Sequence, residues 1–397
     1  MTSWKTYRLG DICKRVCSGG TPKSTEPSYY DGDIPWLNTK EINFNRIYST
    51  ERCITQKGLD NSSAKWIDAN CVIVAMYGAT AAKVAINKIP LTTNQACCNL
   101  SIDEKIADYH YVYYWLCANY TELASLANGG AQQNLNAQQI KDFEISLPSL
   151  EEQRRIAGIL GAIDDKIENN RRINTNLELQ AQALFDNLIG NNNLEYRLIA
   201  DINHTIETGR RPKGGVANIA SGVPSIGAEN IKGLGKYDYS KTKYITADFA
   251  GTMKKGIIKG YELLIYKDGG KPGYFIPNFS IFGEGYPYED MTLNEHVFLL
   301  DFGNKGYNFF AYFFMQTEEV MKYLNAQGSK AAIPGINRND VESIFIPTID
   351  NKEVKEFCDI VEPIITTILV NSKESSRLAI LRDTLLPKLM NGEIITK

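Results

Sequence analysis

The sequence predicts an α+β protein with two tandem globular α/β domains, joined by two long helices that form an antiparallel coiled coil. Three observations predict it: an internal repeat, two long stretches with the hydrophobic spacing of paired helices, and short β-like runs that end in glycine-rich turns. The 397 residues are 43% hydrophobic and 22% charged. This composition is that of an ordinary globular protein and excludes a mostly disordered or fibrous chain.

The internal repeat predicts the domain organisation. Residues 156–189 align with residues 357–390 at a constant offset of 201, and apolar residues fall on apolar residues. The ordered matches indicate a duplication with an internal pseudo-two-fold relation. The other matching segments are Gly19-x-x-Pro22-Lys23 with Gly209-x-x-Pro212-Lys213, IPWLNTKEI (34–42) with VPSIGAENI (223–231), and Asn94-Gln95 with Asn294-Glu295. The predicted segments are a globular domain at 1–148, a spacer helix at 149–190, a second globular domain at 191–347 and a second spacer helix at 348–397.

Apolar residues in the two helical stretches alternate four and three positions apart, which is the seam of a coiled coil. Polar residues interrupt both seams, and antiparallel pairing would place Asn170 near Ser375 and Asn174 near Asn371. Such a polar layer fixes the register of the pair. The alternative is that these side chains face solvent and the helices pack elsewhere. The expected seam and partner-docking residues are Ile156, Leu160, Ile163, Ile167, Asn170, Asn174, Leu177, Leu184, Ile364, Ile368, Asn371, Leu378 and Leu385.

Two residues of the second helix depart from the pattern. Arg382 interrupts the apolar seam, where the neighbouring Leu381 could cover the gap. Pro363 should break the helix near residues 361–363, because proline has no backbone N–H to donate. Each helix of about 40 residues would be about 60 Å long, and a stiff rod of that length acts as a spacer.

Each globular domain is predicted to contain buried strands and one aromatic helix. Residues 71–78 and 261–270 have the pattern of buried strands that run into glycine loops. Residues 109–120 and 307–316 are dense in aromatic side chains. A base-stacking platform is one interpretation of these blocks, but a buried helical core is the favoured one.

The sequence lacks the motifs of common catalytic sites. It contains no P-loop, no G-x-S-x-G, no H-E-x-x-H and no evident set of spaced nuclease carboxylates. The eight cysteines have no C-x-x-C spacing and the histidines number only three, so we expect free, mostly buried thiols and no metal site. No stretch approaches the roughly 18 apolar residues of a membrane span, and the N-terminus lacks a signal-peptide core. These features predict a non-catalytic binding protein of the cytoplasm.

The distribution of charge indicates nucleic-acid binding, although the net charge of −3 alone argues against it. Residues 210–271 hold twelve Lys and Arg against five Asp and Glu. A domain polarised in this way can offer a basic face to phosphates, and unpartnered surface lysines are the alternative. Side chains that suit base edges also occur in the loops. The candidate DNA-binding residues are Thr21, Lys23, Trp36, Asn38, Thr39, Lys40, Gln132, Gln133, Asn134, Arg210, Arg211, Lys213, Asn230, Lys267, Lys271 and Lys330.

The whole chain resembles the specificity (S) subunits of type I restriction-modification systems. The motifs that carry the resemblance are TYRLGDI (6–12), GGTPK (19–23), IPWLNTKEI (34–42), Asn94-Gln95, LPSLEEQRRIAGILGAIDDKI (147–167) and LLPKLMNGEI (385–394). The second copy departs from this pattern, because IPTIDNKEVKEF stands where the first has LPSLEEQRR.

The resemblance implies two target recognition domains, each of which reads one half of a split, asymmetric sequence in double-stranded DNA. It implies that the helices set the gap between the halves and dock two methyltransferase subunits. The chain itself would hold no cofactor: the methyltransferase subunits would bind S-adenosylmethionine, and a restriction subunit that can join would use ATP with Mg²⁺. Two alternatives stay open. One is the specificity subunit of a methylation-only or type II-like split system, and the other is a coiled-coil scaffold that reads no DNA.

Overall fold

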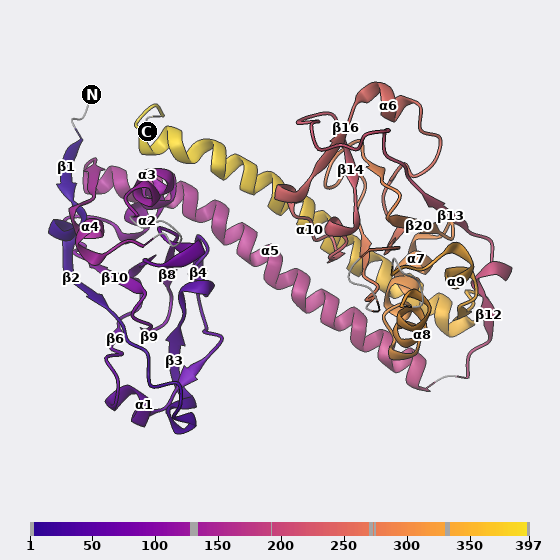
Figure 1. Cartoon of the computed structure of the whole chain (residues 1–397), viewed down its shortest axis with the longest axis horizontal. Helices are drawn as coiled ribbons and strands as arrows, with labels where there is room; N and C mark the ends of the chain where they lie inside the picture. The colour runs from indigo at the N-terminus through magenta and orange to yellow at the C-terminus, as the bar shows by residue number, and fades with distance from the viewer. Residues whose placement is uncertain are drawn as a thin grey trace. The chain divides into compact units, whose positions relative to one another are not determined.

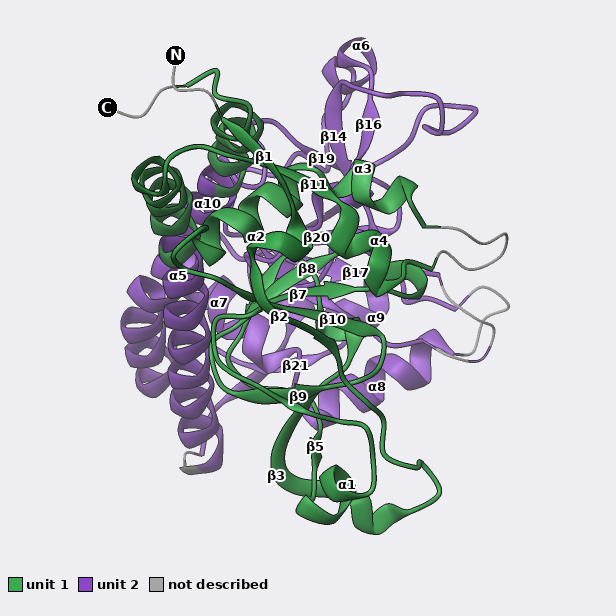
Figure 2. Ribbon diagram, turned by 90° about the vertical axis from the view of Figure 1, so that its left-hand side faces the viewer, with its two compact units in different colours: residues 1–165, 379–397 green, residues 166–378 purple. Residues whose placement is uncertain are grey.

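The computed structural model describes residues 4–127, 134–191, 193–269, 273, 275–329 and 334–394. The chain divides into two compact units, residues 1–165 with 379–397 and residues 166–378 (Figure 2). Each unit holds one sheet-rich domain and part of both long helices, α5 (Leu150–Asn191) and α10 (Lys352–Met390) (Figure 1). This confirms the predicted fold class. The assignment of distinct roles to the four predicted segments stays a prediction.

The domain of the first unit is built on a five-stranded sheet in the order β2-β10-β7-β8-β4. A four-stranded sheet (β5-β3-β9-β6) and a β1-β11 pair complete it. Its strands are β1 (Lys5–Arg8), β2 (Cys13–Ser18), β3 (Tyr30–Leu37), β4 (Asn45–Ile47), β5 (Cys53–Ile54), β6 (Trp66–Ile67), β7 (Val72–Ala75), β8 (Val84–Asn87), β9 (Leu91–Thr93), β10 (Cys97–Ile102) and β11 (Glu144–Leu147). Its short helices are α1 (Gln56–Asp60), α2 (Tyr109–Ala118), α3 (Tyr120–Ser125) and α4 (Ala137–Asp142).

The domain of the second unit repeats this plan. A five-stranded sheet in the order β13-β20-β17-β18-β15 is accompanied by a β16-β14-β19 sheet and a β12-β21 pair. Its strands are β12 (Tyr196–Leu198), β13 (Thr205–Thr208), β14 (Val223–Ile226), β15 (Gly233–Leu234), β16 (Lys243–Ile245), β17 (Leu263–Tyr266), β18 (Phe279–Ile281), β19 (Thr292–Leu293), β20 (Val297–Asp301) and β21 (Phe345–Pro347). Its helices are α6 (Ala247–Gly251), α7 (Lys305–Phe314), α8 (Glu318–Gly328) and α9 (Arg338–Glu342).

The aromatic helices α2 and α7 lie in the domain cores, as the favoured interpretation predicted. Tyr111 and Tyr307 are almost fully buried. Their hydroxyls donate to the backbone oxygens of Ser146 (3.1 Å) and Pro347 (2.8 Å), two positions that the repeat places in register. All eight cysteines are free thiols, also as predicted. None of the helices among the described residues combines the length and the apolar character needed to cross a bilayer.

The polar layer predicted for the helix pair is present in the second unit. Asn170 is buried and its side-chain amide donates to Ser375 Oγ (3.2 Å) and to Glu374 (2.7 Å). Asn371 donates to Asn174 Oδ1 at 2.9 Å. The antiparallel pairing and its register are therefore as predicted, and the solvent-facing alternative is wrong for Asn170.

Two details of the helices differ from expectation. Leu184 was expected in the seam but is 38% exposed, and Phe185 is buried in its place. The reason is that α5 here also packs on α7, where the Phe185 ring lies 5.7 Å from that of Phe310, so the buried face turns away from a strict heptad seam. The expected break at Pro363 is also wrong, because α10 runs continuously through it. Pro363 and Asp359 are both exposed, so the Asp359 carbonyl that loses its helical partner can be hydrated.

Arg382 lies in the seam of the first unit, where a buried polar cluster holds it. Its guanidinium donates to Asp164 Oδ1 at 2.8 Å, and the Tyr114 hydroxyl donates to the other Asp164 oxygen at 2.6 Å. Burial disfavours the charged guanidinium, but the hydrogen bonds to Asp164 and Asp383 and the charges of both carboxylates together outweigh it and raise the pKa of Arg382 above its ordinary value. Leu381 does not cover this position, since it is 47% exposed.

Candidate nucleic-acid interface

Several predicted DNA-binding residues have structural roles instead. Trp36 is 3% exposed because its side chain packs between strands, and its indole nitrogen donates to the Gly20 carbonyl at 2.9 Å. Asn230 is fully buried, and its Oδ1 accepts from the Gly227 N–H at 3.0 Å. Asn38 is half-buried and caps a short 3-10 helix through Lys40 N. Burial therefore argues against base contacts by Trp36 and Asn230, whereas a contact by Asn38 stays a prediction.

The remaining candidates are at the surface or outside the described part of the chain. Thr21, Lys23, Lys40, Asn134, Arg210 and Lys213 are exposed, while Thr39, Arg211 and Lys267 are half-buried. Lys40 forms an ion pair with Glu51 at 2.8 Å. Gln132, Gln133, Lys271 and Lys330 lie outside the described residues.

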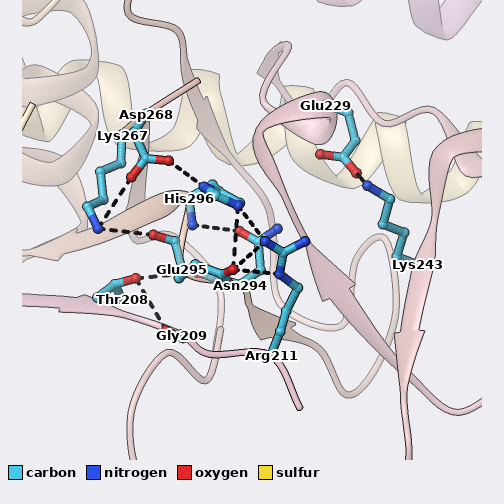
Figure 3. Close-up of polar contacts among 10 residues, drawn as sticks. All are labelled: Thr208, Gly209, Arg211, Glu229, Lys243, Lys267, Asp268, Asn294, Glu295 and His296. Carbon is cyan, nitrogen blue, oxygen red and sulfur yellow. Dashed lines mark hydrogen bonds and ion pairs between the residues drawn. The ribbon is translucent and has the colours of Figure 1, made fainter. Parts of the chain in front are cut away.

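In the second unit, three loops meet at the ends of β13, β17 and β20 to form a polar corner. We call Arg211, Lys267, Asp268, Glu295 and His296 the charged corner (Figure 3). Figure 3 shows Arg211 and Lys267 approaching the 294–296 segment from two sides, with the Glu229–Lys243 ion pair apart from them. The loop after β13 is held in place by Gly209, whose N–H donates to the Asn294 carbonyl at 3.1 Å.

The arginine of the charged corner is held on one edge. Arg211 Nε donates to Glu295 Oε1 at 2.6 Å, and Nη2 contacts both that oxygen and His296 Nε2. Because a guanidinium only donates, His296 Nε2 accepts and the ring proton lies on Nδ1, which faces Asp268. The Nη1 group of Arg211 forms no hydrogen bond or ion pair within the described part of the chain.

The charges of this corner stabilise one another. The hydrogen bond to Glu295 raises the pKa of Arg211 above its ordinary value. Burial alone would raise the pKa of Glu295, but the hydrogen bonds that its carboxylate accepts and the charge of Arg211 together outweigh it and hold that pKa below its ordinary value. Lys267 adds an ion pair with Asp268 at 3.5 Å and donates to the Glu295 backbone oxygen at 3.2 Å. The corner therefore carries balanced charges rather than an excess of positive charge.

Beside the charged corner lies a loop pair that we call the basic loops, residues 210–215 and 252–256. Arg210 joins them, because its Nη2 donates to the Thr252 carbonyl at 2.9 Å and its guanidinium lies 4.9 Å above the Phe249 ring. Lys213 and two lysines of the second loop are exposed and, within the described residues, have no carboxylate within ion-pair distance. Those two lysines are Lys254 and Lys255.

The first unit has an uncharged counterpart of this corner. The Thr21 hydroxyl donates to Gln95 Oε1, and both side chains are exposed. Tyr77, at the end of β7, is 44% exposed and pairs its backbone with Asn134. We call Thr21, Tyr77, Gln95 and Asn134 the neutral corner.

The two corners share one backbone frame. Gly19 and Gly209 approach the carbonyls of Thr93 and Leu293 so closely that a Cβ atom would collide with either oxygen. Asn94 and Asn294 each accept, through Oδ1, the N–H two residues later, at 3.1 and 2.9 Å. The frame is thus repeated in detail. In the repeat, Thr21 is equivalent to Arg211, and Gln95 is equivalent to Glu295.

Sequence reasoning named Thr21, Asn134, Arg211 and Lys267. It missed five other members of these corners: Tyr77, Gln95, Asp268, Glu295 and His296. The match of Asn94-Gln95 with Asn294-Glu295 was visible in the repeat. Its importance depends on contacts to Thr21 and Arg211, which lie 74 and 84 positions away in the chain. Within the described residues, no group of three or more His, Cys, Asp or Glu side chains is placed to hold a metal ion.

Comparison with known proteins finds similar DNA specificity domains and a similar fold. Residues 1–179 match the family model of the type I restriction modification DNA specificity domain. The whole fold is similar to the crystal structure of the S subunit of a type I restriction-modification system from M. genitalium. That likeness has a TM-score of 0.63 and 16% identity, over 98% of this chain and 96% of that one.

One curated relative matches nearly the whole chain, and another matches part of it. The MjaIX specificity subunit of Methanocaldococcus jannaschii, a type I restriction enzyme subunit, is 26% identical over 98% of this chain and 93% of its own length. The EcoR124I/EcoR124II specificity subunit of Escherichia coli is 30% identical over 41% of this chain and 40% of its own length. These matches agree with the resemblance to type I restriction-modification specificity subunits that the sequence indicated.

Proposed function

We propose that this chain is the DNA-recognition subunit of a type I restriction-modification complex, and that each domain reads one half of a split, asymmetric target. The observation that carries the proposal is the repeated loop frame with different exposed side chains in its two copies. Identical readers related by two-fold symmetry favour a palindrome, whereas two different readers in one chain favour two different half-sites.

The basic loops of the second domain supply the phosphate contacts in this proposal. Arg210, Lys213, Lys254 and Lys255 project from two adjoining loops and lack carboxylate partners within the described residues. Contacts of this kind position a protein on DNA without reading its sequence. They also explain how a chain with a net charge of −3 can bind a polyanion.

The two long helices act, in this proposal, as the spacer that sets the gap between the half-sites and as the docking surface for two methyltransferase subunits. The polar layer around Asn170 supports a fixed register, since a slip would leave its buried amide without partners. The chain itself is non-catalytic in this account. S-adenosylmethionine, and ATP with Mg²⁺ where a restriction subunit joins, bind to the partner subunits, and the complex works on DNA in the cytoplasm.

Two alternatives lead to different expectations. A methylation-only or type II-like split system would use the same reader without a separate restriction subunit. A scaffold that reads no DNA would show no steep loss of DNA affinity with salt, whereas a reader that releases counterions from phosphates must show it. Arg210 and Lys213, which have no carboxylate partner among the described residues, favour the reader.

Reversing the charge of the basic loops is expected to weaken DNA binding strongly. The variant Arg210→Glu with Lys213→Glu should lose about tenfold in affinity for each phosphate contact at about 0.1 M salt, and its salt dependence should become shallower. Fluorescence anisotropy with a duplex containing the target, over a range of salt, measures both. Lys322→Glu on α8, where the lysine is 74% exposed, is the matched control and should bind normally. Unchanged affinity and slope in the double variant would exclude the basic loops as a DNA contact.

A further inference from the structure

The charged and neutral corners carry different residues at equivalent positions while their backbone frame is the same. In chain order, the equivalent residues of the first and second domains are Thr21 and Arg211, Tyr77 and Asp268, Gln95 and Glu295, Ala96 and His296, and Asn134 and Gly335. The last pair follows from the matching bridges of Tyr77 with Asn134 and of Asp268 with Gly335. A frame kept in detail with different residues at its equivalent positions is the arrangement that two readers of different sequences require.

The charged corner presents a fixed donor. Glu295 and His296 occupy the Nε and Nη2 atoms of Arg211, so the guanidinium cannot turn freely. The two N–H groups of Nη1 are left for a ligand. An arginine held in this way donates in one direction, and guanine is the base with two adjacent acceptors, N7 and O6, in the major groove.

Charge balance argues that this corner contacts a base rather than a phosphate. Arg211 and Lys267 are matched by Glu295 and Asp268, and the two carboxylates would repel a phosphate placed beside them. The neighbouring Arg210 and Lys213 have no such carboxylates within the described residues and suit the phosphate role. The two adjacent groups of cations therefore divide the tasks of reading and positioning.

The neutral corner presents a donor and an acceptor without charge. The Thr21 hydroxyl donates to Gln95 Oε1, which leaves the Gln95 amide N–H groups and the Thr21 oxygen lone pairs for a ligand. Adenine offers the matching set in the major groove, an acceptor at N7 and a donor at N6.

We propose that these two equivalent pairs are specificity-determining residues: Arg211 with Glu295 reads a G·C pair in one half-site, and Thr21 with Gln95 reads an A·T pair in the other. Glu295 is a positioning residue for Arg211. The inference rests on the proposed function and adds which residues read, and which base pair each one selects.

Exchanging the pairs between the domains tests the inference. The chain is produced with its methyltransferase subunit, and N6-methyladenine is mapped on genomic DNA by long-read sequencing for the wild type, for Arg211→Thr with Glu295→Gln, and for Thr21→Arg with Gln95→Glu. Each exchange should reduce the preference for one base pair by about tenfold, in one half-site only, while the other half-site stays as in the wild type. Lys213→Ala, in the same loop as Arg211, should lower the extent of methylation without changing either half-site.

The outcomes separate this inference from the proposed function. A wild-type complex that methylates no split sequence overturns the proposed function itself. A wild-type split sequence that both exchanges leave unchanged overturns only the inference, and shows that the ion pair of Arg211 serves the loop structure alone. If thermal melting shows that one exchange fails to fold, the other decides, and Arg211→Lys gives a further test in the second domain. Lysine keeps the charge but cannot be held by Glu295 and His296 in the same way, so the G·C preference should weaken.

Discussion

Inserting one heptad into each of the two long helices is expected to abolish methylation at the original gap and to transfer it to a longer one. Seven residues add about 10 Å to a helix, which corresponds to about three base-pair steps of about 3.4 Å. The pairing of Asn170 with Ser375 and of Asn174 with Asn371 shows which positions of α5 and α10 face each other. The insertions belong between Ile167 and Glu168 and between Arg377 and Leu378.

The paired insertion has an internal control. A heptad placed in α5 alone shifts the two parts of α5 relative to α10 by seven residues. The contacts of the buried Asn170 amide with Glu374 and Ser375 can then not form together with the seam on the other side of the insertion. That single insertion should destabilise the helix pair, as measured by faster backbone hydrogen exchange in residues 166–178. Methylation at the original gap by the folded double-insertion variant would contradict the role of the helices as a spacer.

Replacing Arg382 by alanine is expected to destabilise the first unit by about 3 kcal/mol, because it leaves the carboxylate of Asp164 largely buried without its cation. The side chains are 28% and 13% exposed, so solvent screens the pair only weakly. Tyr114 would still donate its hydrogen bond to Asp164. All four tryptophans of the chain lie in the first unit, so tryptophan fluorescence during urea unfolding follows that unit specifically.

The second unit supplies the compensating variant for this test. The repeat places Phe310, Ile365 and Ala181, all fully buried, at the positions of Tyr114, Asp164 and Arg382. The triple variant Tyr114→Phe, Asp164→Ile, Arg382→Ala therefore installs a packing solution that the chain already uses, and it should regain most of the lost stability. A single Arg382→Ala variant as stable as the wild type would show that the polar cluster does not hold this end of the helix pair.

The helices and the domain repeat could be predicted because their signals are local or periodic. Apolar spacing located α5 and α10, and the polar interruptions at Asn170 and Asn371 indicated the register of an antiparallel pair. This reasoning was wrong at two places, and in both the surroundings of the helix decide the outcome. Phe185 replaces Leu184 because α7 packs on α5, and Pro363 is tolerated because its side of α10 faces solvent.

The candidate site was only partly predictable. Charge counting located the basic segment and included Arg211, but it could not show that Glu295 neutralises this arginine while Lys213 has no such partner. Residue type also led to wrong predictions of DNA contact. Trp36 and Asn230 are of types that can contact bases, but both are buried in the fold. The division into charged corner, neutral corner and basic loops depends on contacts between segments far apart in the chain.

The most direct test of the central claim is to express this chain with its methyltransferase subunit and to map N6-methyladenine on the host genome by long-read sequencing. A reader with two different domains predicts one split, asymmetric sequence, with unlike halves, a gap of fixed length and a methylated adenine in each half. A palindromic sequence, or a single unbroken one, would contradict the assignment of one half-site to each domain. Absence of methylation from a soluble, associated complex would contradict the proposed recognition role.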